Sequence, residues 1–387
     1  MKMRVCLMGV ILLLLSGGMA WGQWSEPVLV DTPWDSLGVN GPSRDWCPYV
    51  TVDGQYLYFA SWRGDGPGDL YVSHMTDSGW GTALKLPFCT LENDERNPSV
   101  NSTNDTLYFI RWAGNWDIWW AFRTGPCDTC WGEPERLPEP INSSRIEFSV
   151  WCTPDNERLL FSSTRTGGMG GEDIYECRRD ATTFTGWSVP SPLPGHVNSW
   201  GMDSYPSMGF DTTELFYWQD DGYLYVTQLS DSGWQTGERL PDTINRIIIR
   251  DPSEITPAIT PDGRRLYFSS RWSDSTATAG DIWYTERELS VDPCEPRRSG
   301  EVAVEVFPNP ATAGGMLTLD LPGQPLRPIV LYNLLGQEVY RHSVSNPPNT
   351  GGRQVLLTLP SGIPSGVYFA NVVTAKESVV RKVIVHH

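Results

Sequence analysis

The sequence predicts an all-β protein, a five-bladed β-propeller followed by a small immunoglobulin-like β-sandwich. One phrase recurs five times: an acidic residue, a short strand, a polar turn, and then Leu with aromatic neighbours. Its Leu falls at steps of 50, 52, 56 and 51 residues, at Leu57, Leu107, Leu159, Leu215 and Leu266. A period of this size with several short strands per unit is typical of a propeller. Beyond residue 300, six short strands with period-two alternation favour a small antiparallel sandwich.

Each repeat predicts three strands in order. In the fifth copy, residues 257–260 form a short innermost strand, and Pro261-Asp262-Gly263 forms a turn in which Pro presets φ and Gly supplies φ > 0. Residues 266–268 predict the second strand, whose consecutive apolar residues fit a sheet covered on both faces. Residues 281–284 predict the third strand.

A fourth strand begins with Trp and ends six residues later with Leu, and the fifth copy lacks it. The N-terminal segment WSEPVLV, from Trp24 to Val30, has the same spacing. We therefore expect this segment to supply the outer strand of the last blade, which closes the ring and leaves no exposed sheet edge. The other four copies of the strand are Trp80–Leu86, Trp131–Leu137, Trp187–Leu193 and Trp234–Leu240.

The first 22 residues predict a Sec signal peptide. Lys2 and Arg4 precede an apolar run over residues 7–15 that is too short to span a bilayer, and Ala20-Trp21-Gly22 offers a small-x-small cleavage site. We expect no transmembrane segment in the mature chain. The predicted organisation is a signal peptide (1–22), a propeller (23–290), a Pro-rich charged linker (291–300) and a C-terminal domain (301–387).

The charge is concentrated in the propeller. The whole chain carries a net charge of −17, and the first 22 residues contribute +2 and residues 301–387 contribute +1, which leaves −20 for residues 23–300. Such a surface repels nucleic acid and other polyanions, so nucleic-acid binding is not expected.

Seven cysteines remain after removal of the signal peptide, in an exported and therefore oxidising context. We expect Cys127 and Cys130 to form a disulfide, and Cys47 with Cys89 is a plausible second bridge. One Cys-x-x-Cys with two His in the propeller cannot complete a four-ligand zinc site. No metal or cofactor is therefore expected.

Three groups of residues recur in loops that should share one face of the propeller. An acid precedes each innermost strand, and we interpret this ring as structural, with a central cation site as the alternative; its members are Asp45, Glu95, Glu147, Asp203 and Glu254. Aromatic planes beside charged groups suit a sugar or peptide site, with loop packing as the alternative. The candidate ligand-binding residues are Trp46, Trp62, Trp112, Trp200 and Trp272.

The third group pairs a loop Arg with the Asp that opens the third strand. These pairs are predicted to brace the loop as ion pairs, and the fourth blade lacks both members. The predicted pairs are Arg63 with Asp69, Arg111 with Asp117, Arg165 with Asp173 and Arg271 with Asp281.

An enzyme is the alternative class. Five-bladed propellers include glycoside hydrolases, which need two carboxylates in unlike environments. The innermost strands contain no acid after their lead position, and no serine-elbow, P-loop or dinucleotide-binding motif occurs. We therefore expect a non-catalytic binding or scaffold protein, with a glycan-active propeller hydrolase as the alternative.

The repeat phrase, with its P-D-G turn, L-Y-F-S-S strand, D-I-Y strand and G-W strand, resembles the WD40-like β-propeller repeat of TolB-type and outer-membrane peptidoglycan-associated proteins. The resemblance covers about two thirds of the chain. It implies a binding or scaffolding role, with a surface glycan, peptidoglycan or a protein as the ligand.

The C-terminal domain resembles the type A sorting domain of the type IX secretion system. The resemblance rests on Phe307-Pro308-Asn309-Pro310, on the L-Y-N-L-L-G-Q-E-V string, and on S-G-V-Y-F followed by a Lys-containing last strand. It implies Sec export, passage through the type IX machinery, and release or anchoring at the cell surface after the domain is removed. The motif residues it assigns are Pro308, Asn309, Pro310, Gly336, Gly366, Tyr368 and Lys382.

Overall fold

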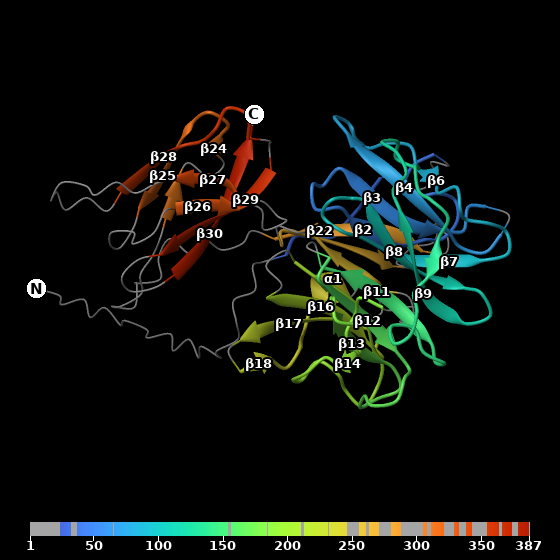
Figure 1. Ribbon diagram of the computed structural model, residues 1–387. Coiled ribbons are helices and arrows are strands. Elements are labelled where there is room, and N and C mark those ends of the chain that lie inside the picture. Colours follow the sequence, from blue (N-terminus) through green and yellow to red (C-terminus); the bar gives the residue numbers. More distant parts are fainter. Residues whose placement is uncertain are drawn as a thin grey trace, which may run out of the picture.

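The computed structural model describes residues 24–386 except for segments 32–36, 65, 154–155, 184, 210–212, 231, 246–254, 261–262, 271–279, 288–304, 308–310, 321–328, 333–337, 343–353, 364–365 and 374–377. The predicted signal peptide and linker lie outside the described residues. Figure 1 shows five small sheets arranged around an axis, together with a separate group of C-terminal strands. The prediction of a five-bladed propeller is confirmed.

Each blade contains three long antiparallel strands and a short outer one. Blade one has β2 (Asp45–Val50), β3 (Tyr56–Ser61), β4 (Asp69–Thr76), β5 (Gly79–Trp80) and β6 (Leu84–Lys85). Blade two has β7 (Asp94–Val100), β8 (Thr106–Trp112), β9 (Trp116–Phe122) and β10 (Glu135–Arg136). Blade three has β11 (Glu147–Cys152), β12 (Arg158–Ser163), β13 (Asp173–Arg178) and β14 (Ser191–Pro192).

Blade four has β15 (Asp203–Met208), β16 (Glu214–Gln219), β17 (Leu224–Ser230), β18 (Gly233–Trp234) and β19 (Glu238–Arg239). The short helix α1 (Asp242–Asn245) follows it. Blade five has β20 (Pro257–Ile259), β21 (Arg265–Ser270) and β22 (Asp281–Glu286), and its outer strand is β1 (Val28–Leu29).

The N-terminal segment closes the ring, as predicted. Strand β1 pairs antiparallel with β22, with Val28 opposite Tyr284 and Leu29 opposite Trp283. Trp24 is buried, and its ring packs edge-on against Phe216 at 6.2 Å between ring centroids. The segment therefore covers the free edge of β22 and also packs against blade four.

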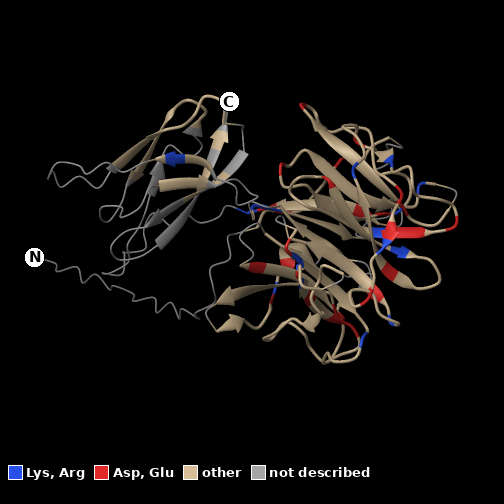
Figure 2. Cartoon of the chain, in the orientation of Figure 1, with Lys and Arg blue, Asp and Glu red and all other residues tan. Residues whose placement is uncertain are grey.

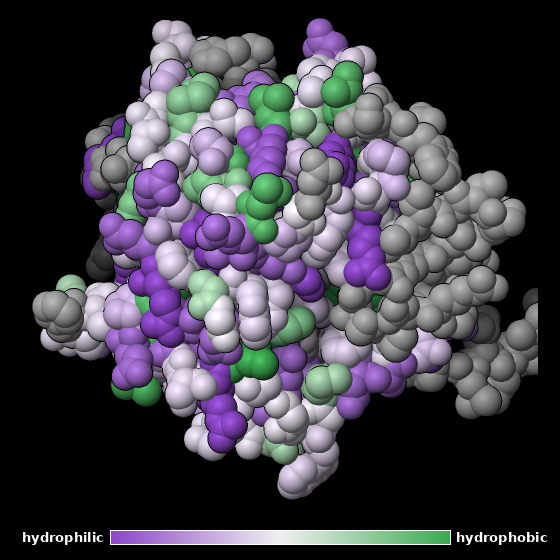
Figure 3. Space-filling view, turned by 90° about the vertical axis from the view of Figure 1, so that its right-hand side faces the viewer, coloured by the Kyte–Doolittle hydropathy of each residue, from purple (hydrophilic) through white to green (hydrophobic). Residues whose placement is uncertain are grey.

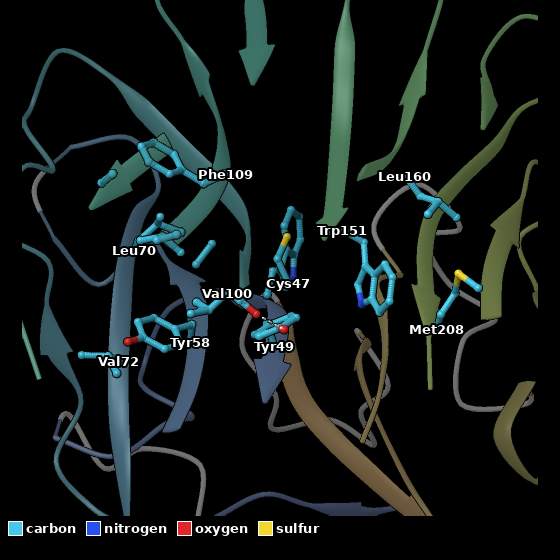
Figure 4. Packing of buried hydrophobic residues seen from close by; sticks show 14 of the residues in the cluster. Cys47, Tyr49, Tyr58, Leu70, Val72, Val100, Phe109, Trp151, Leu160 and Met208 are labelled. Atoms are coloured by element: carbon cyan, nitrogen blue, oxygen red, sulfur yellow. Dashed lines mark hydrogen bonds between the residues drawn. The ribbon is translucent and has the colours of Figure 1, made fainter. Parts of the chain in front are cut away.

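The core lies between neighbouring blades because the second strand of each blade is covered on both faces. Leu57, Tyr58 and Phe59 are consecutive and fully buried, which matches the predicted two-sided burial. Figure 4 shows part of this packing, with side chains from several blades lying between their sheets.

The Trp residues of the outer strands form part of a second repeated contact. In blades two, three and five, an Arg at the end of the third strand stacks on the ring, in the pairs Arg123–Trp131 at 4.5 Å, Arg179–Trp187 at 3.9 Å and Arg287–Trp24 at 4.9 Å. A cation over an indole face is attracted by the ring quadrupole, so these pairs fasten the outer strand to its sheet.

A buried Asn in the connections between blades holds the third strand of the preceding blade. Asn142 accepts the Ile118 N–H at 2.8 Å and donates to the Ile118 carbonyl at 2.8 Å and the Leu137 carbonyl at 2.7 Å. Equivalent amides are Asn40 at Ile282, Asn198 at Ile174 and Asn245 at Leu224. Cys89 takes this place in blade one, where the Leu70 N–H points at its sulfur.

The C-terminal strands form two sheets. One contains β23 (Glu305–Phe307), β25 (Met316–Asp320) and β28 (Gln354–Thr358); the other contains β24 (Ala311–Thr312), β30 (Ser378–His386), β29 (Gly366–Val373), β26 (Ile329–Tyr332) and β27 (Glu338–His342). Leu317, Leu357, Leu331 and Tyr368 come from both sheets and share one buried cluster. The immunoglobulin-like form of this unit stays a prediction.

One of the two predicted disulfides is present. Cys127 and Cys130 are bonded. The prediction of a bridge between Cys47 and Cys89 is wrong, because both residues are buried and they form no disulfide with each other. Cys47 lies on the propeller axis, whereas Cys89 takes the amide position between blades one and two.

Candidate functional site

A pocket lies on the propeller axis, lined by the innermost strands of all five blades. Its cavity volume is about 20 Å³, which is room for about one water molecule, and its mouth opens to solvent. One lining residue per blade stands two positions after the ring acid, and these are Cys47, Asn97, Ser149, Tyr205 and Thr256. Figure 4 shows Cys47, Tyr49 and Trp151 near one another at the centre of the propeller.

The backbone is strained where it borders this pocket. Cys47, Asn97 and Tyr205 have φ of 53°, 52° and 56°, in the left-handed region that non-glycine residues seldom adopt. Each lies at a bulge where the strand register shifts, and Pro follows each of them. Such strain costs about 1–3 kcal/mol per residue and clusters at binding and catalytic sites. Nothing in the sequence pattern indicated it.

The ring acids are held by the loop arginines of their own blades. Arg63 bonds Asp45 at 2.6 Å, Arg111 bonds Glu95 at 2.8 Å and Arg165 bonds Glu147 at 2.9 Å. The same guanidinium groups also donate to backbone carbonyls of the connection from the preceding blade, at Gly38, Phe88 and Pro140. Each Arg therefore braces a junction between blades.

The predicted pairing of these arginines with the Asp of the third strand is wrong. The reason is that the chain turns back after the second strand beside the start of the first, so the ring acid is the nearer carboxylate. In blade four, the Gln219 amide donates to Asp203 at 2.6 Å in place of an Arg. Glu254 and Arg271 lie outside the described residues.

The Asp of the third strand takes its partner from the outer strand instead. Lys85 pairs with Asp69 at 2.8 Å, and Arg136 pairs with Asp117 at 2.7 Å. Asp173 accepts the N–H groups of Met169 and Gly170 at 3.1 Å. In blade five, no base within the described residues pairs with Asp281, whose Oδ1 is buried without a hydrogen-bond partner among them.

Burial, together with the nearby carboxylates of Asp45 and Asp31, raises the pKa of Asp281 to about 7. The folded state therefore binds a proton that the unfolded state releases above pH 4, so this group's contribution to stability falls as pH rises toward 7. We expect Asp281→Asn to remove most of that slope and to stabilise the protein at pH 8, by on the order of 3 kcal/mol. Thermal melts of both proteins from pH 4.5 to 8 measure it, and parallel pH profiles would contradict the assignment.

Asp69, Cys89 and Glu95 are the one group in the described residues with three possible metal-ligand atoms within 4.8 Å of one another. Both carboxylates already contact bases, Lys85 and Arg111. Burial raises the pKa of Glu95 to about 7 in spite of Arg111. The ion pairs account for this cluster without a cation.

The aromatic side chains form a collar at the end of the propeller where the innermost strands begin. Trp46 packs on Trp62 at 5.0 Å, and Arg96 lies 4.8 Å from both Trp62 and Trp116. The collar continues from Trp116 to Phe148, Tyr205 and Trp218 through ring contacts of 6.0 to 6.2 Å. Tyr205 also lines the axial pocket.

The structure separates the candidate ligand-binding Trp residues into two kinds. Trp46 is 2% exposed and Trp62 is half-buried, so both pack within the collar. Trp112 is 43% exposed and Trp200 is 85% exposed, at the same end of the propeller. Trp272 lies outside the described residues.

Of the sorting-motif residues, Tyr368 lies in the buried C-terminal cluster, 4% exposed. Gly366 lies opposite Val385, and Lys382 lies opposite Phe369, in the antiparallel pair β29–β30. Pro308, Asn309, Pro310 and Gly336 lie outside the described residues.

No helix in the described part of the chain has the length and apolar composition needed to cross a membrane.

Several solved structures are similar to this chain. TolB from Acinetobacter baumannii is 13% identical with a TM-score of 0.39, and the match covers 65% of this chain and 56% of TolB. An α-L-arabinofuranosidase from Podospora anserina is 14% identical with a TM-score of 0.45, covering 69% of this chain and 97% of the enzyme. PorZ, a surface component of the type-IX secretion system of Porphyromonas gingivalis, is 14% identical with a TM-score of 0.35. The match covers 89% of this chain and 45% of PorZ. Likeness at this level carries no argument about activity.

No curated protein matches the sequence. Residues 305–386 match the family model of the secretion system C-terminal sorting domain. The chain is therefore a five-bladed β-propeller that carries a secretion system C-terminal sorting domain, which supports its secretion to the cell surface or outer membrane.

Proposed function

We propose that the propeller is a non-catalytic binding protein, released from or anchored at the cell surface after export by the type IX machinery. It recognises a glycan, peptidoglycan or protein ligand at the collar end of the propeller. The observation that carries this proposal is the axial pocket of strained polar residues beneath a collar of aromatic rings, with Trp112 and Trp200 exposed around it. Aromatic planes beside hydrogen-bonding groups suit both sugars and peptides.

The alternative, a glycan-active hydrolase, requires two carboxylates facing the substrate. Among the described residues, those that line the axial pocket include no Asp or Glu. The ring acids Asp45, Glu95 and Glu147 each form an ion pair with an Arg. These contacts support binding over hydrolysis.

The test is a glycan and peptide array probed with the full chain, followed by affinity measurements. We expect Trp112→Ala or Trp200→Ala to weaken the selected ligand about tenfold, equivalent to about 1.4 kcal/mol. Both side chains are exposed, so the melting temperature should hardly change. The matched control is Phe122→Ala, an aromatic 47% exposed at the opposite end of blade two. Unchanged binding in both Trp variants, or cleavage of an arrayed glycan, would contradict the proposal.

A further inference from the structure

The junction between blades three and four departs from the repeat at three positions. Pro192 stands opposite Tyr175, where blades one, two and four carry Lys85, Arg136 and Arg239 and blade five carries Leu29. Gln219 replaces the loop arginine. Glu172 precedes the third-strand Asp, where the other blades have Gly68, Trp116, Gly222 and Gly280. Each change removes a positive charge or adds a negative one.

Three buried carboxylates consequently lack a basic partner among the described residues. Glu172 accepts the Ser204 hydroxyl and is 8% exposed. Asp173 accepts backbone N–H groups, and Asp203 accepts Gln219 and the Ser199 N–H. The junction between blades one and two provides the contrast, because Lys85 and Arg111 neutralise both of its carboxylates. Figure 2 shows how acids outnumber bases over the propeller, and Figure 3 shows the hydropathy of the residues on one face of the molecule.

Three large apolar side chains are exposed over this charge. Met169 is 49% exposed, Trp200 is 85% exposed and Met202 is 41% exposed. We call these residues the 3/4 surface.

The two loops that carry the 3/4 surface are held together by their backbones. The Gly171 N–H donates to the Gly201 carbonyl at 2.9 Å. A Cβ at Gly170 would lie 2.0 Å from the same oxygen, so only glycine permits this approach. The exposed Asp220 carboxylate lies beside Gly201, since a Cβ there would meet Asp220 Oδ2 at 2.4 Å. The surface is therefore preformed and has a carboxylate beside it.

We propose that the 3/4 surface binds a basic polypeptide segment in which Lys or Arg alternates with apolar residues. This inference rests on the proposed binding function and names the ligand class. Methionine side chains adapt to apolar partners, and an exposed indole attracts a cation through its face. The exposed Asp220 carboxylate can pair directly with a Lys or Arg of the segment, whereas Glu172, Asp173 and Asp203 are buried and favour a nearby cation only through space. A neutral sugar gains nothing from that charge.

Selection from a random dodecapeptide library on the full chain tests the proposal, with fluorescence anisotropy of the selected peptides at 50 and 300 mM NaCl. We expect enrichment of Lys or Arg beside apolar residues, and affinity that falls at least threefold at the higher salt. Trp200→Ala should weaken binding at least tenfold.

The sharpest variant is Gln219→Arg, which restores the guanidinium that the other blades carry. It should retain the melting temperature of the parent and lose at least fivefold in affinity. Gln235→Arg, the same change between β18 and β19, is the matched control and should bind like the parent. Acidic or neutral selected peptides, or full affinity in Gln219→Arg, would overturn the inference.

The two proposals fail separately. If a glycan binds in a way that depends on Trp112 and the library yields no binding peptide, the proposed binding function stands and the inference of a basic peptide ligand is wrong. Absence of both glycan and peptide binding would overturn the two together.

Discussion

A variant lacking residues 24–30 should lose its single cooperative unfolding transition. The deletion removes the strand that pairs with β22 through Tyr284 and Trp283, and it removes buried Trp24 from its contacts with Phe216 and Arg287. An unpaired sheet edge is also a template for aggregation. Calorimetry and size-exclusion chromatography should show a broadened transition and oligomers.

Two point variants separate pairing from packing in this segment. Trp24→Ala should cost about 3–5 kcal/mol, the range for truncating a buried aromatic. Val28→Ala, in the same strand but 50% exposed, should change stability by no more than about 0.5 kcal/mol. A deletion variant that melts like the parent would exclude closure by the N-terminus.

Asn142→Leu should destabilise the propeller by roughly 3 kcal/mol or more. The change strips hydrogen bonds from the Ile118 N–H, the Ile118 carbonyl and the Leu137 carbonyl. Each buried polar group left without a partner costs about 1–3 kcal/mol. Urea denaturation monitored by Trp fluorescence measures the loss.

Blade one offers the reciprocal experiment, because Cys89 already occupies the amide position there. Cys89→Asn should be tolerated and should stabilise by up to about 1 kcal/mol, the net worth of a hydrogen bond. If Asn142→Leu is neutral, the amides do not hold the blades and the recurring contact is incidental.

The sequence could predict the features that recur from one blade to the next. The spacing of Leu57, Leu107 and the later copies predicted the number of blades. The absence of a fourth strand in the fifth repeat, together with the matching segment from Trp24, predicted the closure of the ring. The apolar run in each second strand predicted two-sided burial. Each of these depends on strand periodicity and on the rule that sheet edges be paired, which act along the chain or between adjacent strands.

The sequence also contains a regular signal for the buried amides, but their role was not predicted from it. Asn142, Asn198 and Asn245 each follow the Leu-Pro that ends the outer strand by the same four-residue step. A polar residue at a fixed offset in a loop is typical of turn chemistry, so its role as a bridge to another strand was not distinguishable without the fold.

Only the tertiary structure decided which loop groups meet. Arg63 pairs with Asp45 and not with Asp69 because the chain turns back after the second strand beside the start of the first. Cys47 and Cys89 are not bonded to each other because Cys47 lies on the propeller axis and Cys89 lies between blades one and two. The exposure of each tryptophan depended on the neighbouring blade. A Cβ at Gly280 of blade five would lie 2.2 Å from Trp46 Nε1, so glycine there admits the buried ring, whereas Trp200 is 85% exposed. Periodicity along one chain determined the propeller, and contacts between non-adjacent segments, which carry no periodic signal, determined its surface.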